Sequence, residues 1–331
     1  MPTPSTSLFT QFTELVTTTL RNHKPELADN ISKNNALMRK MQTKGRTRVE
    51  DGGLSIVAPL DYAANATYQR YSGYDTLNIS ASEVLSAAEY PWRQVAVHVV
   101  ASGLELRSNA GKQRIINLAK ARLMNAMRTF KNGISADIYS DGTASNQING
   151  LQALVSDAGT GTVGQINSTT FPFWQNKVQS AAAPLQGGAG VTLSATTFEG
   201  QFLLPAYLEV SRGGDQPDLI PMSNDYFSFF EASQVAIKRY NDRQDADAGF
   251  VSLKYKNADV VFDGGSLGGG IPAARGYLLN TDYLELVVHR DANMTEVDSK
   301  TSVNQDAVVI PILWQGNLVC SNRSLQCVLR A

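Results

Sequence analysis

Cysteine and histidine are both scarce in this chain of 331 residues. The two cysteines, Cys320 and Cys327, are seven positions apart, which puts them on opposite faces of one extended strand and argues against a bridge between them. Unbridged thiols fit a reducing compartment. The three histidines, His23, His98 and His289, are far apart in the sequence and form no metal-ligand spacing. We therefore expect no metal and no other cofactor.

Long apolar runs are also missing. No run approaches the roughly 18 residues that cross a bilayer, so we expect no membrane span. The start, MPTPSTSLFTQF, has no basic region followed by an apolar core, so we expect no signal peptide. The formal net charge of -1 argues against strong polyanion binding by the chain as a whole. A hydrophobic content of 43% supports a large core, in one large or two ordinary domains.

Catalytic motifs are weak. Gly264–Gly268 matches the G-x-S-x-G pattern around Ser266, but that motif needs a helix directly after the serine. Gly269, Gly270 and Pro272 follow instead and do not start a helix easily. The same glycines match part of a dinucleotide-binding fingerprint, without the βαβ unit that it requires. A flexible loop is the favoured interpretation, and a serine hydrolase using Ser266 is the alternative.

A calcium loop is suggested by Asp242, Asp245 and Asp247, but its spacing is incomplete. Gly249 is out of register, and Tyr255 stands where a glutamate ligand is required. A polar loop and a weak ion site both remain open. Because no catalytic constellation appears, the sequence favours a binding or structural role over an enzyme.

One long helix is predicted from Ser108 to Tyr139, about 48 Å at ~1.5 Å per residue. Ser108 is placed to cap its start, and Asp141-Gly142 supplies a turn after its end. Apolar residues recur there at steps of three or four, the period of one helix face: Ile115, Ala119, Leu123, Ala126, Phe130 and Ile134. We call this predicted element the spine.

The chain before the spine begins with two predicted helices, from Leu8 to near Pro25 and from about Glu26 to Met41. Six positive charges gather around the end of the second: Lys33, Arg39, Lys40, Lys44, Arg46 and Arg48. They form either a solvated basic face or a contact with an acidic neighbour or nucleic acid. Short β-prone runs follow at Leu54–Val57, Ala66–Tyr71, Leu77–Ser80 and Val95–Val100. We expect a long protruding hairpin that has no core of its own and is covered by something else, in the first place another copy.

The chain after the spine mixes helices and strands without a βαβ rhythm, which predicts an α+β fold. We expect a buried edge strand at Pro217–Pro221 and a helix that starts after Ser223 and runs through Tyr240. Strand-rich segments follow at Leu253–Phe262, Tyr277–Arg290 and Val308–Leu329.

Several motifs, in this order, resemble the major capsid proteins of tailed bacteriophages, which have the HK97-like fold. The similarity spans about residues 27–325. It is carried by LADNISKNNALM from Leu27, YQRYSGYD from Tyr68, SGLE from Ser102, FPFW from Phe171, RGGDQPDLI from Arg212, DAGF from Asp247, YLLNTDYLEL from Tyr277 and ILWQGNLVC from Ile312.

The resemblance implies an N-terminal arm (1–45), an extended-loop hairpin (46–80), a peripheral domain with the spine helix (81–145), an axial domain (146–275) and a return to the peripheral domain (276–331). It implies hexamers and pentamers that close an icosahedral shell around double-stranded phage DNA. The virion capsid would assemble in the cytoplasm of the host bacterium. A non-viral compartment shell of the same fold is the alternative.

Two departures from the family bear on partners. Some members crosslink through a lysine of the extended loop, but no lysine lies between Lys44 and Lys112, so we expect no such crosslink. Some members carry a long N-terminal scaffolding region, but the arm here is short, so we expect a separate scaffolding protein. A cement or decoration protein, a portal protein and weak, non-specific contact with packaged DNA complete the expected partners.

Contacts between copies are expected at aromatic and basic residues of the loop and the strands after it: Tyr68, Tyr71, Tyr74, Arg48, Arg70, Arg93 and Arg107. The alternative for the tyrosines is that they only pack the hairpin. On the spine, four cations fall within an arc of about 120°, with no acid from Lys112 to Lys131: Arg114, Lys120, Arg128 and Lys131. We expect this basic face to meet acidic groups of a neighbouring subunit or, less favoured, DNA.

Overall fold

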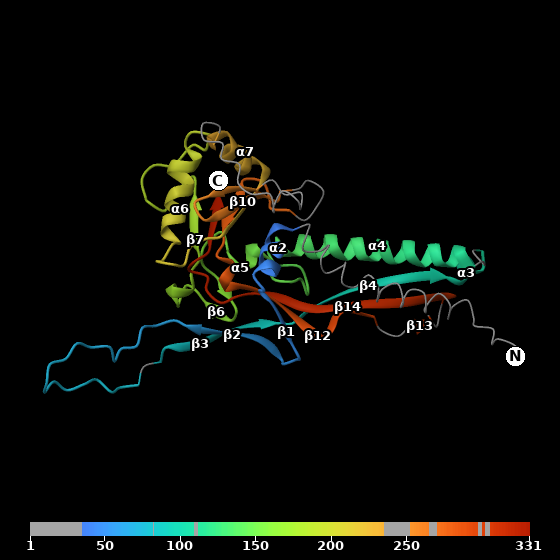
Figure 1. Ribbon diagram of the computed structural model, residues 1–331, viewed down its shortest axis with the longest axis horizontal. Coiled ribbons are helices and arrows are strands. Elements are labelled where there is room, and N and C mark those ends of the chain that lie inside the picture. The colour runs from blue at the N-terminus through green and yellow to red at the C-terminus, as the bar shows by residue number, and fades with distance from the viewer. Residues whose placement is uncertain are drawn as a thin grey trace.

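The computed structural model describes residues 35–81, 83–108, 112–234, 252–264, 270–296, 300–301 and 305–331. Figure 1 shows an elongated part, in which a long helix lies along a sheet, and a more compact part that carries the C-terminus. A hairpin projects from the molecule on the side opposite to the free end of the long helix.

The first sheet has the order β1-β12-β14-β13, with β4 on the other side of β14. Its long strands are β4 (Arg93–Ser102), β12 (Leu284–Glu296) and β14 (Ala307–Cys320), and its short ones are β1 (Thr47–Glu50) and β13 (Lys300–Thr301). β14 runs antiparallel to both β4 and β12, whereas β1 runs parallel to β12. The strand predicted at Val95–Val100 is confirmed within β4. The predicted strand-rich segments Tyr277–Arg290 and Val308–Leu329 contribute β12 and β14 to this sheet.

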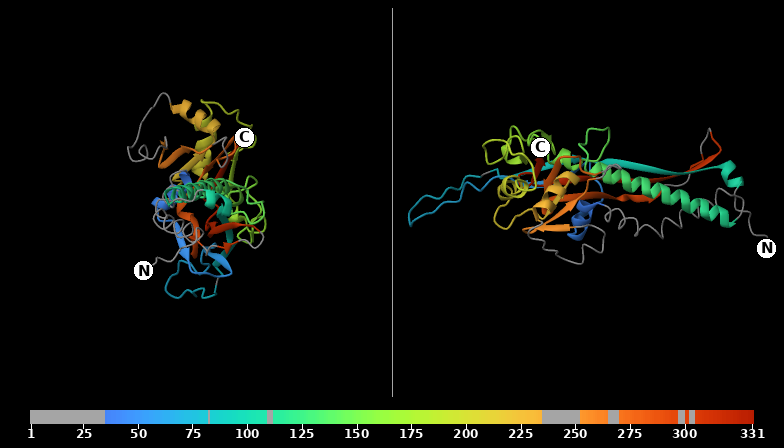
Figure 2. Two further views of the ribbon diagram at one scale, coloured as in Figure 1. Left: turned by 90° about the vertical axis from the view of Figure 1, so that its right-hand side faces the viewer. Right: turned by 90° about the horizontal axis from the view of Figure 1, so that it is seen from above.

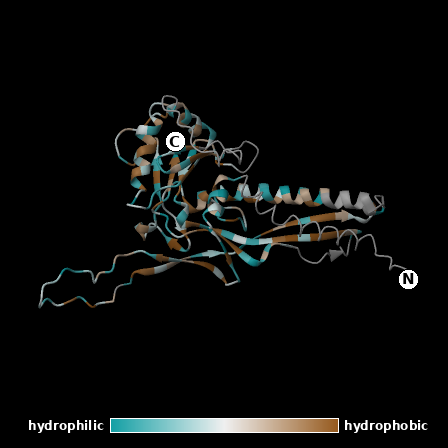
Figure 3. Ribbon diagram, in the orientation of Figure 1, coloured by the Kyte–Doolittle hydropathy of each residue, from teal (hydrophilic) through white to brown (hydrophobic). Residues whose placement is uncertain are grey.

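The spine is confirmed as helix α4 (Lys112–Ile138), which lies along β4 and β14 (Figures 1 and 2). Leu123, Ala126, Phe130 and Ile134 of the predicted stripe are buried, and the Phe130 ring contacts Trp314 of β14 at 6.3 Å between centroids. In Figure 3, hydrophobic residues run along β4 and β14 at the end away from the hairpin, whereas hydrophilic and hydrophobic residues alternate along the described part of α4. The apolar stripe therefore packs on the sheet, as its period predicts.

The predicted cap is wrong. Ser108 ends a separate short helix, α3 (Gly103–Ser108), and α4 begins four residues later. β4 leads directly into α3, where the side chains of Ser102 and Glu105 each accept a hydrogen bond from the other residue's backbone N–H.

The second sheet is six-stranded, in the order β7-β15-β11-β8-β10-β9. Its strands are β7 (Lys177–Ser180), β8 (Leu219–Met222), β9 (Ser252–Tyr255), β10 (Ala258–Phe262), β11 (Arg275–Leu278) and β15 (Cys327–Arg330). The helices of this part are α5 (Leu151–Leu154), the 3-10 helix η1 (Pro172–Trp174), the π-helix η2 (Phe198–Leu203), α6 (Leu204–Glu209), α7 (Asn224–Ser233) and the 3-10 helix η4 (Thr281–Tyr283). A second apolar core, built around Phe198, Phe202 and Tyr226, lies here.

β8 is buried as predicted but is not an edge strand, because it lies between β10 and β11. Proline is disfavoured inside a sheet because it lacks an N–H donor. Here the hydrogen bonds toward β11 come from Leu219 and Ser223, on either side of Pro221. Ser223 precedes α7, but its hydroxyl accepts a hydrogen bond from the Arg275 N–H instead of capping the helix.

The two cysteines do not share a strand, which corrects the prediction from their spacing. Cys320 ends β14 in the first sheet, and Cys327 begins β15 in the second. Both are free and buried, and burial raises the pKa of each thiol to about 12.

Candidate functional site

The protruding hairpin is formed by β2 (Ser55–Asp61) and β3 (Leu85–Pro91), which pair antiparallel from Ser55–Pro91 to Asp61–Leu85. Its base is packed, with Ile56, Ala58, Leu60, Ala88 and Tyr90 buried. Beyond it, the described residues between 62 and 84 form no strand, so the runs Ala66–Tyr71 and Leu77–Ser80 were wrongly predicted as strands. Among the described residues these runs have no partner strand and no core to pack on, and residues of high β-propensity form a strand only where both are present.

The tip of the hairpin, residues 61–87, exposes large apolar and aromatic side chains. Tyr68 is 82% exposed, Tyr71 66% and Ile79 91%. Its charged residues are Arg70 against Asp61, Asp75 and Glu83, a net charge of 1 − 3 = −2. The tip thus combines apolar surface with negative charge. Exposed patches of this kind mark surfaces that another molecule covers.

A small two-stranded turn holds the base of the hairpin. It consists of β5 (Thr162–Val163) and β6 (Ile166–Asn167). The Glu89 N–H of β3 donates to the Gly164 carbonyl at 3.0 Å. Gly164 has φ +59, and a Cβ there would lie 2.7 Å from the Ala88 Cβ, so only glycine allows this close approach.

The aromatic segment around η1 supports the hairpin from the side. The Phe173 ring stacks on Tyr62, at the start of the tip, with 5.1 Å between centroids. The neighbouring Trp174 is buried and donates its indole N–H to the Val163 carbonyl at 2.9 Å. The FPFW motif therefore links the hairpin to the turn that holds its base.

A buried arginine, Arg323, fixes the backbone of α5 and η1, which lie near the hairpin base. It donates to the Leu154 carbonyl at 2.6 Å, the Trp174 carbonyl at 3.0 Å and the Asn176 side-chain oxygen at 2.7 Å. No carboxylate contacts it among the described residues, and burial lowers the pKa of the guanidinium. Sequence reasoning missed Arg323, because one arginine in a polar turn gives no periodic signal.

Three further hydrogen bonds tie the hairpin base to the first sheet and to the turn that precedes β2. Tyr90 donates its hydroxyl to the Cys320 carbonyl at 2.8 Å, and Asn317 donates its amide to the Pro91 carbonyl at 2.8 Å. Trp92 donates its indole N–H to the Gly53 carbonyl at 3.0 Å. The direction in which the hairpin leaves the body is therefore set by partners on several sides.

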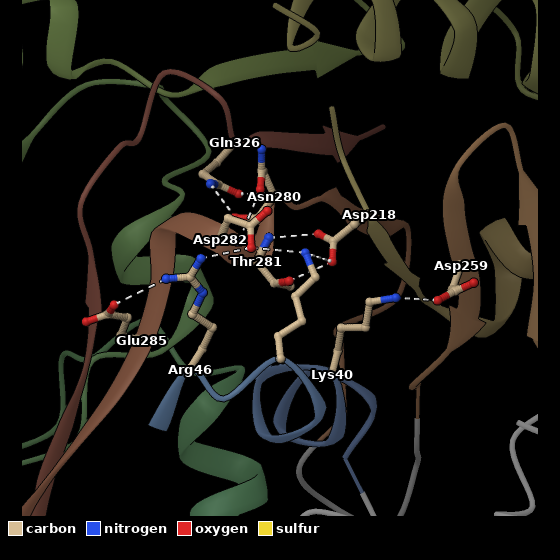
Figure 4. A network of polar contacts seen from close by, with 10 residues as sticks. Lys40, Arg46, Asp218, Asp259, Asn280, Thr281, Asp282, Glu285 and Gln326 are labelled. Atoms are coloured by element: carbon tan, nitrogen blue, oxygen red, sulfur yellow. Dashed lines mark hydrogen bonds and ion pairs between the residues drawn. The ribbon is translucent and has the colours of Figure 1, made fainter. Parts of the chain in front are cut away.

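The basic cluster around helix α2 (Ala36–Thr43) contacts the chain's own carboxylates (Figure 4). Lys40 contacts Asp259 at 2.5 Å, and Lys44 contacts Asp218 at 3.0 Å and Asp282 at 3.2 Å. Burial alone would lower the pKa of Lys44, but its bonds to Asp218 and Asp282 raise it. The acidic partners of these cations belong to the chain itself, and Lys33 of the predicted cluster lies outside the described residues.

The same cluster continues into β1. Arg46 contacts Asp282 at 3.0 Å and Glu285 at 3.7 Å, and Arg48 contacts Glu50 at 3.1 Å and Glu285 at 3.6 Å. Together these pairs connect the two sheets. Asp259 lies in β10 of the second sheet and Asp218 directly precedes β8, whereas Glu285 lies in β12 of the first sheet and Asp282 precedes that strand. We call this set, Lys40, Lys44, Arg46 and Arg48 with their acids, the cationic clamp.

A buried polar cluster lies where α2, the end of α4 and β10 meet. Asn35 caps α2 by accepting from Leu37 N–H at 3.1 Å and Met38 N–H at 3.2 Å. Tyr139 donates its hydroxyl to Asp263 at 2.5 Å, and the Ala36 N–H donates to the same carboxylate oxygen at 3.2 Å. Burial raises the pKa of the Asp263 carboxyl.

The four arginines expected between copies have different surroundings. Arg48 belongs to the cationic clamp, and Arg107 pairs with Asp306. Arg70 is exposed on the tip, as are Tyr68, Tyr71 and Tyr74. Arg93 is half-buried at the start of β4, and its side chain makes no hydrogen bond or ion pair with a described residue.

On the spine, Arg128 is exposed, and Lys131 is half-buried, which lowers its pKa. Neither makes an ion pair with a residue that the structure describes. The side chains of Arg114 and Lys120 lie outside the described part. Arg122, on the same helix, pairs with Glu105 of α3 at 2.6 Å.

The weaker motifs fall mostly outside the described residues. These are Ser266 with its flanking glycines, the aspartates Asp242, Asp245 and Asp247, the first predicted helix, and the second up to residue 34. Within the described ranges, no group of three or more His, Cys, Asp or Glu side chains is placed to hold a metal ion. None of the described helices is both long and apolar enough to cross a membrane.

Comparison with known proteins gives a result at the level of the fold. No family model matches the chain, and no curated protein matches it in sequence. Solved structures do match. The capsid of cyanophage A-1(L) has a TM-score of 0.63 at 16% identity, over 87% of this chain and 91% of that one. The procapsid of satellite phage P4 has a TM-score of 0.50 at 10% identity, over 93% and 90%. The capsid of Myoviridae phage XM1 has a TM-score of 0.50 at 11% identity, over 88% and 91%. The chain therefore has the fold of phage capsid proteins, as its sequence motifs predicted.

Proposed function

We propose that this chain is the major capsid protein of a tailed bacteriophage and that its role is structural. The observation that carries the proposal is the match of nearly the whole chain to the cyanophage capsid structure. A hairpin that exposes Tyr68, Tyr71 and Ile79 supports it, because a lone chain gains nothing from such a surface.

The proposed layout is an N-terminal arm, the extended hairpin, a peripheral domain around α4 and the first sheet, and an axial domain around the second sheet. In this layout many copies form hexamers and pentamers that close an icosahedral shell around double-stranded DNA in the host cytoplasm. Each contact between copies is modest, and the shell gains stability from many contacts made together. A scaffolding protein, a portal and a cement protein are the proposed partners.

Negative-stain electron microscopy of the purified chain tests the proposal. Shells, tubes or rings of repeating units are expected, and a preparation that stays monodisperse and small at high concentration contradicts it. Efficient closure of uniform shells by this chain alone would argue against a separate scaffolding protein.

Tyr71 on the hairpin tip offers a test at one residue. Its 66% exposure leaves a large ring for a neighbouring copy to cover. Tyr71→Asp is expected to yield folded subunits that do not assemble, because a carboxylate would have to be buried in the contact. Tyr71→Phe keeps the ring and should assemble. Normal shells from the aspartate variant would remove Tyr71 from the proposed interface.

A further inference from the structure

A polar pocket opens beside Arg93 at the start of β4. It has a volume of about 420 Å³ and is lined by residues 92–96 of β4 and the turn before it, 313–315 of β14, Asn146 and Ala292. No aspartate or glutamate is among these lining residues. Amides of Gln94, Asn146 and Gln315 line it, together with the Arg93 guanidinium.

Arg93 is the unusual member of this pocket. Its Nε atom is buried and has no hydrogen-bond partner, and no ion pair to a described residue compensates its charge. By contrast, each guanidinium nitrogen of the buried Arg323 donates a hydrogen bond. The pocket therefore holds a guanidinium whose charge no described residue of the single chain neutralises.

The chemistry of the pocket selects an anion with two oxygen atoms. A guanidinium presents a planar fork of donors that fits a carboxylate or a phosphate. The lining amides supply further donors. Binding to a nucleic-acid backbone relies on several cations at once, whereas this pocket has one, so the carboxylate is favoured.

The chain itself carries carboxylates that fit this need. Asp61 and Glu83 of the hairpin tip make no hydrogen bond or ion pair with a described residue, and Asp75 bonds only the backbone N–H of Ser72. The tip has a net charge of −2 and no lysine. It projects away from the body (Figure 1), so it does not reach the pocket of its own chain.

We propose that the Arg93 pocket receives a carboxylate from the hairpin tip of a second copy of this chain. The inference rests on the proposed function, because it requires copies that associate. In this contact the Arg93 guanidinium donates hydrogen bonds, and a carboxylate of Asp61, Asp75 or Glu83 accepts them.

Charge reversal tests the proposal on the full chain. The assembled fraction is measured by sedimentation velocity and electron microscopy, and folding is checked by circular dichroism and melting. Arg93→Glu is expected to lower the assembled fraction at least about tenfold, as losing one partner of a buried charge pair does. Combining it with Asp61→Arg, Asp75→Arg or Glu83→Arg should restore assembly in at least one pair.

The control is a change of equal charge outside the pocket. Arg93→Gln and His98→Glu each make the formal net charge one unit more negative, with histidine counted as neutral, and His98 is exposed on the same strand. Only Arg93→Gln is expected to impair assembly. It also serves as the test variant if Arg93→Glu does not fold.

Three results overturn the inference while the proposed function stands. They are wild-type assembly by Arg93→Gln, failure of all three reversed pairs to restore assembly, and normal shells of Arg93→Glu with only weaker binding of a double-stranded DNA probe. A wild-type chain that never associates would overturn the proposed function and this inference with it.

Discussion

Replacing the buried Arg323 by methionine should destabilise the subunit and loosen the base of the hairpin. Methionine has a similar length but donates no hydrogen bond. The carbonyls of Leu154 and Trp174 lose the donors that now lie at 2.6 and 3.0 Å. The Asn176 oxygen loses one donor but keeps the Ser156 N–H at 3.1 Å.

The size of the effect follows from the two carbonyls that lose their partner. Each unsatisfied buried acceptor costs about 1–3 kcal/mol, or about 2–6 kcal/mol for two. Part of this cost is offset, because the variant no longer buries a charged guanidinium. Burial disfavours that charge, as the lowered pKa of Arg323 indicates. We expect a net loss of about 3 kcal/mol in the free energy of unfolding. At about 2.1 cal/mol/K per residue, this lowers the melting midpoint of a chain of 331 residues by about 4 °C.

Thermal melting of the purified subunit, followed by circular dichroism, measures this loss. Arg330→Met makes the same change at an exposed position of β15 and should shift the free energy by less than about 0.5 kcal/mol. If the two variants melt together, the Arg323 hydrogen bonds do not stabilise this region and the reasoning is wrong.

Two further predictions concern stability. Gly164→Ala should lower the melting midpoint, because φ +59 and the contact with Ala88 leave no room for a Cβ. Gly200→Ala, with open space around it, should leave the midpoint unchanged, and equal midpoints for the two variants would refute the close approach at Gly164. Burial raises the folded pKa of Asp263, so its charged form opposes folding and stability should rise as pH falls through that pKa. Asp263→Asn should therefore gain stability over the wild type at pH 7 and lose that gain in acid, as urea unfolding measures. For Asp282, burial alone would raise the pKa, but bonds from Arg46 and Lys44 lower it, so Asp282→Asn should lose stability at pH 7 and approach the wild type in acid. Parallel pH profiles for the two variants would contradict both assignments.

Features with a local period could be predicted from the sequence. The stripe of Leu123, Phe130 and Ile134 follows the helix repeat and packs on β14 as its spacing indicates. The long strands β12 and β14 have β-branched runs that give the same kind of signal. The motifs that resemble capsid proteins predicted the fold, because their order along the chain is specific although each motif is short.

Features that depend on contacts distant in sequence could not be predicted. The spacing of Cys320 and Cys327 predicted one shared strand, because it does not reveal the turn between them. Arg323 lies in that turn and donates to the Leu154 and Trp174 carbonyls. The acids that surround Lys40 and Lys44 lie more than 170 positions away. The Arg93 pocket is formed by residues of β4, β12 and β14 together with Trp92 and Asn146, and no spacing in the sequence indicates that these segments meet.

The cationic clamp also has a consequence for the chain's behaviour toward polyanions. Binding to nucleic acid is driven by the counterions that leave the phosphates when free cations replace them. Lys40, Lys44, Arg46 and Arg48 are each already matched by a carboxylate within about 4 Å or less. They therefore have little charge left to displace such counterions, and the salt dependence of any nucleic-acid binding by this chain would owe little to its most basic stretch.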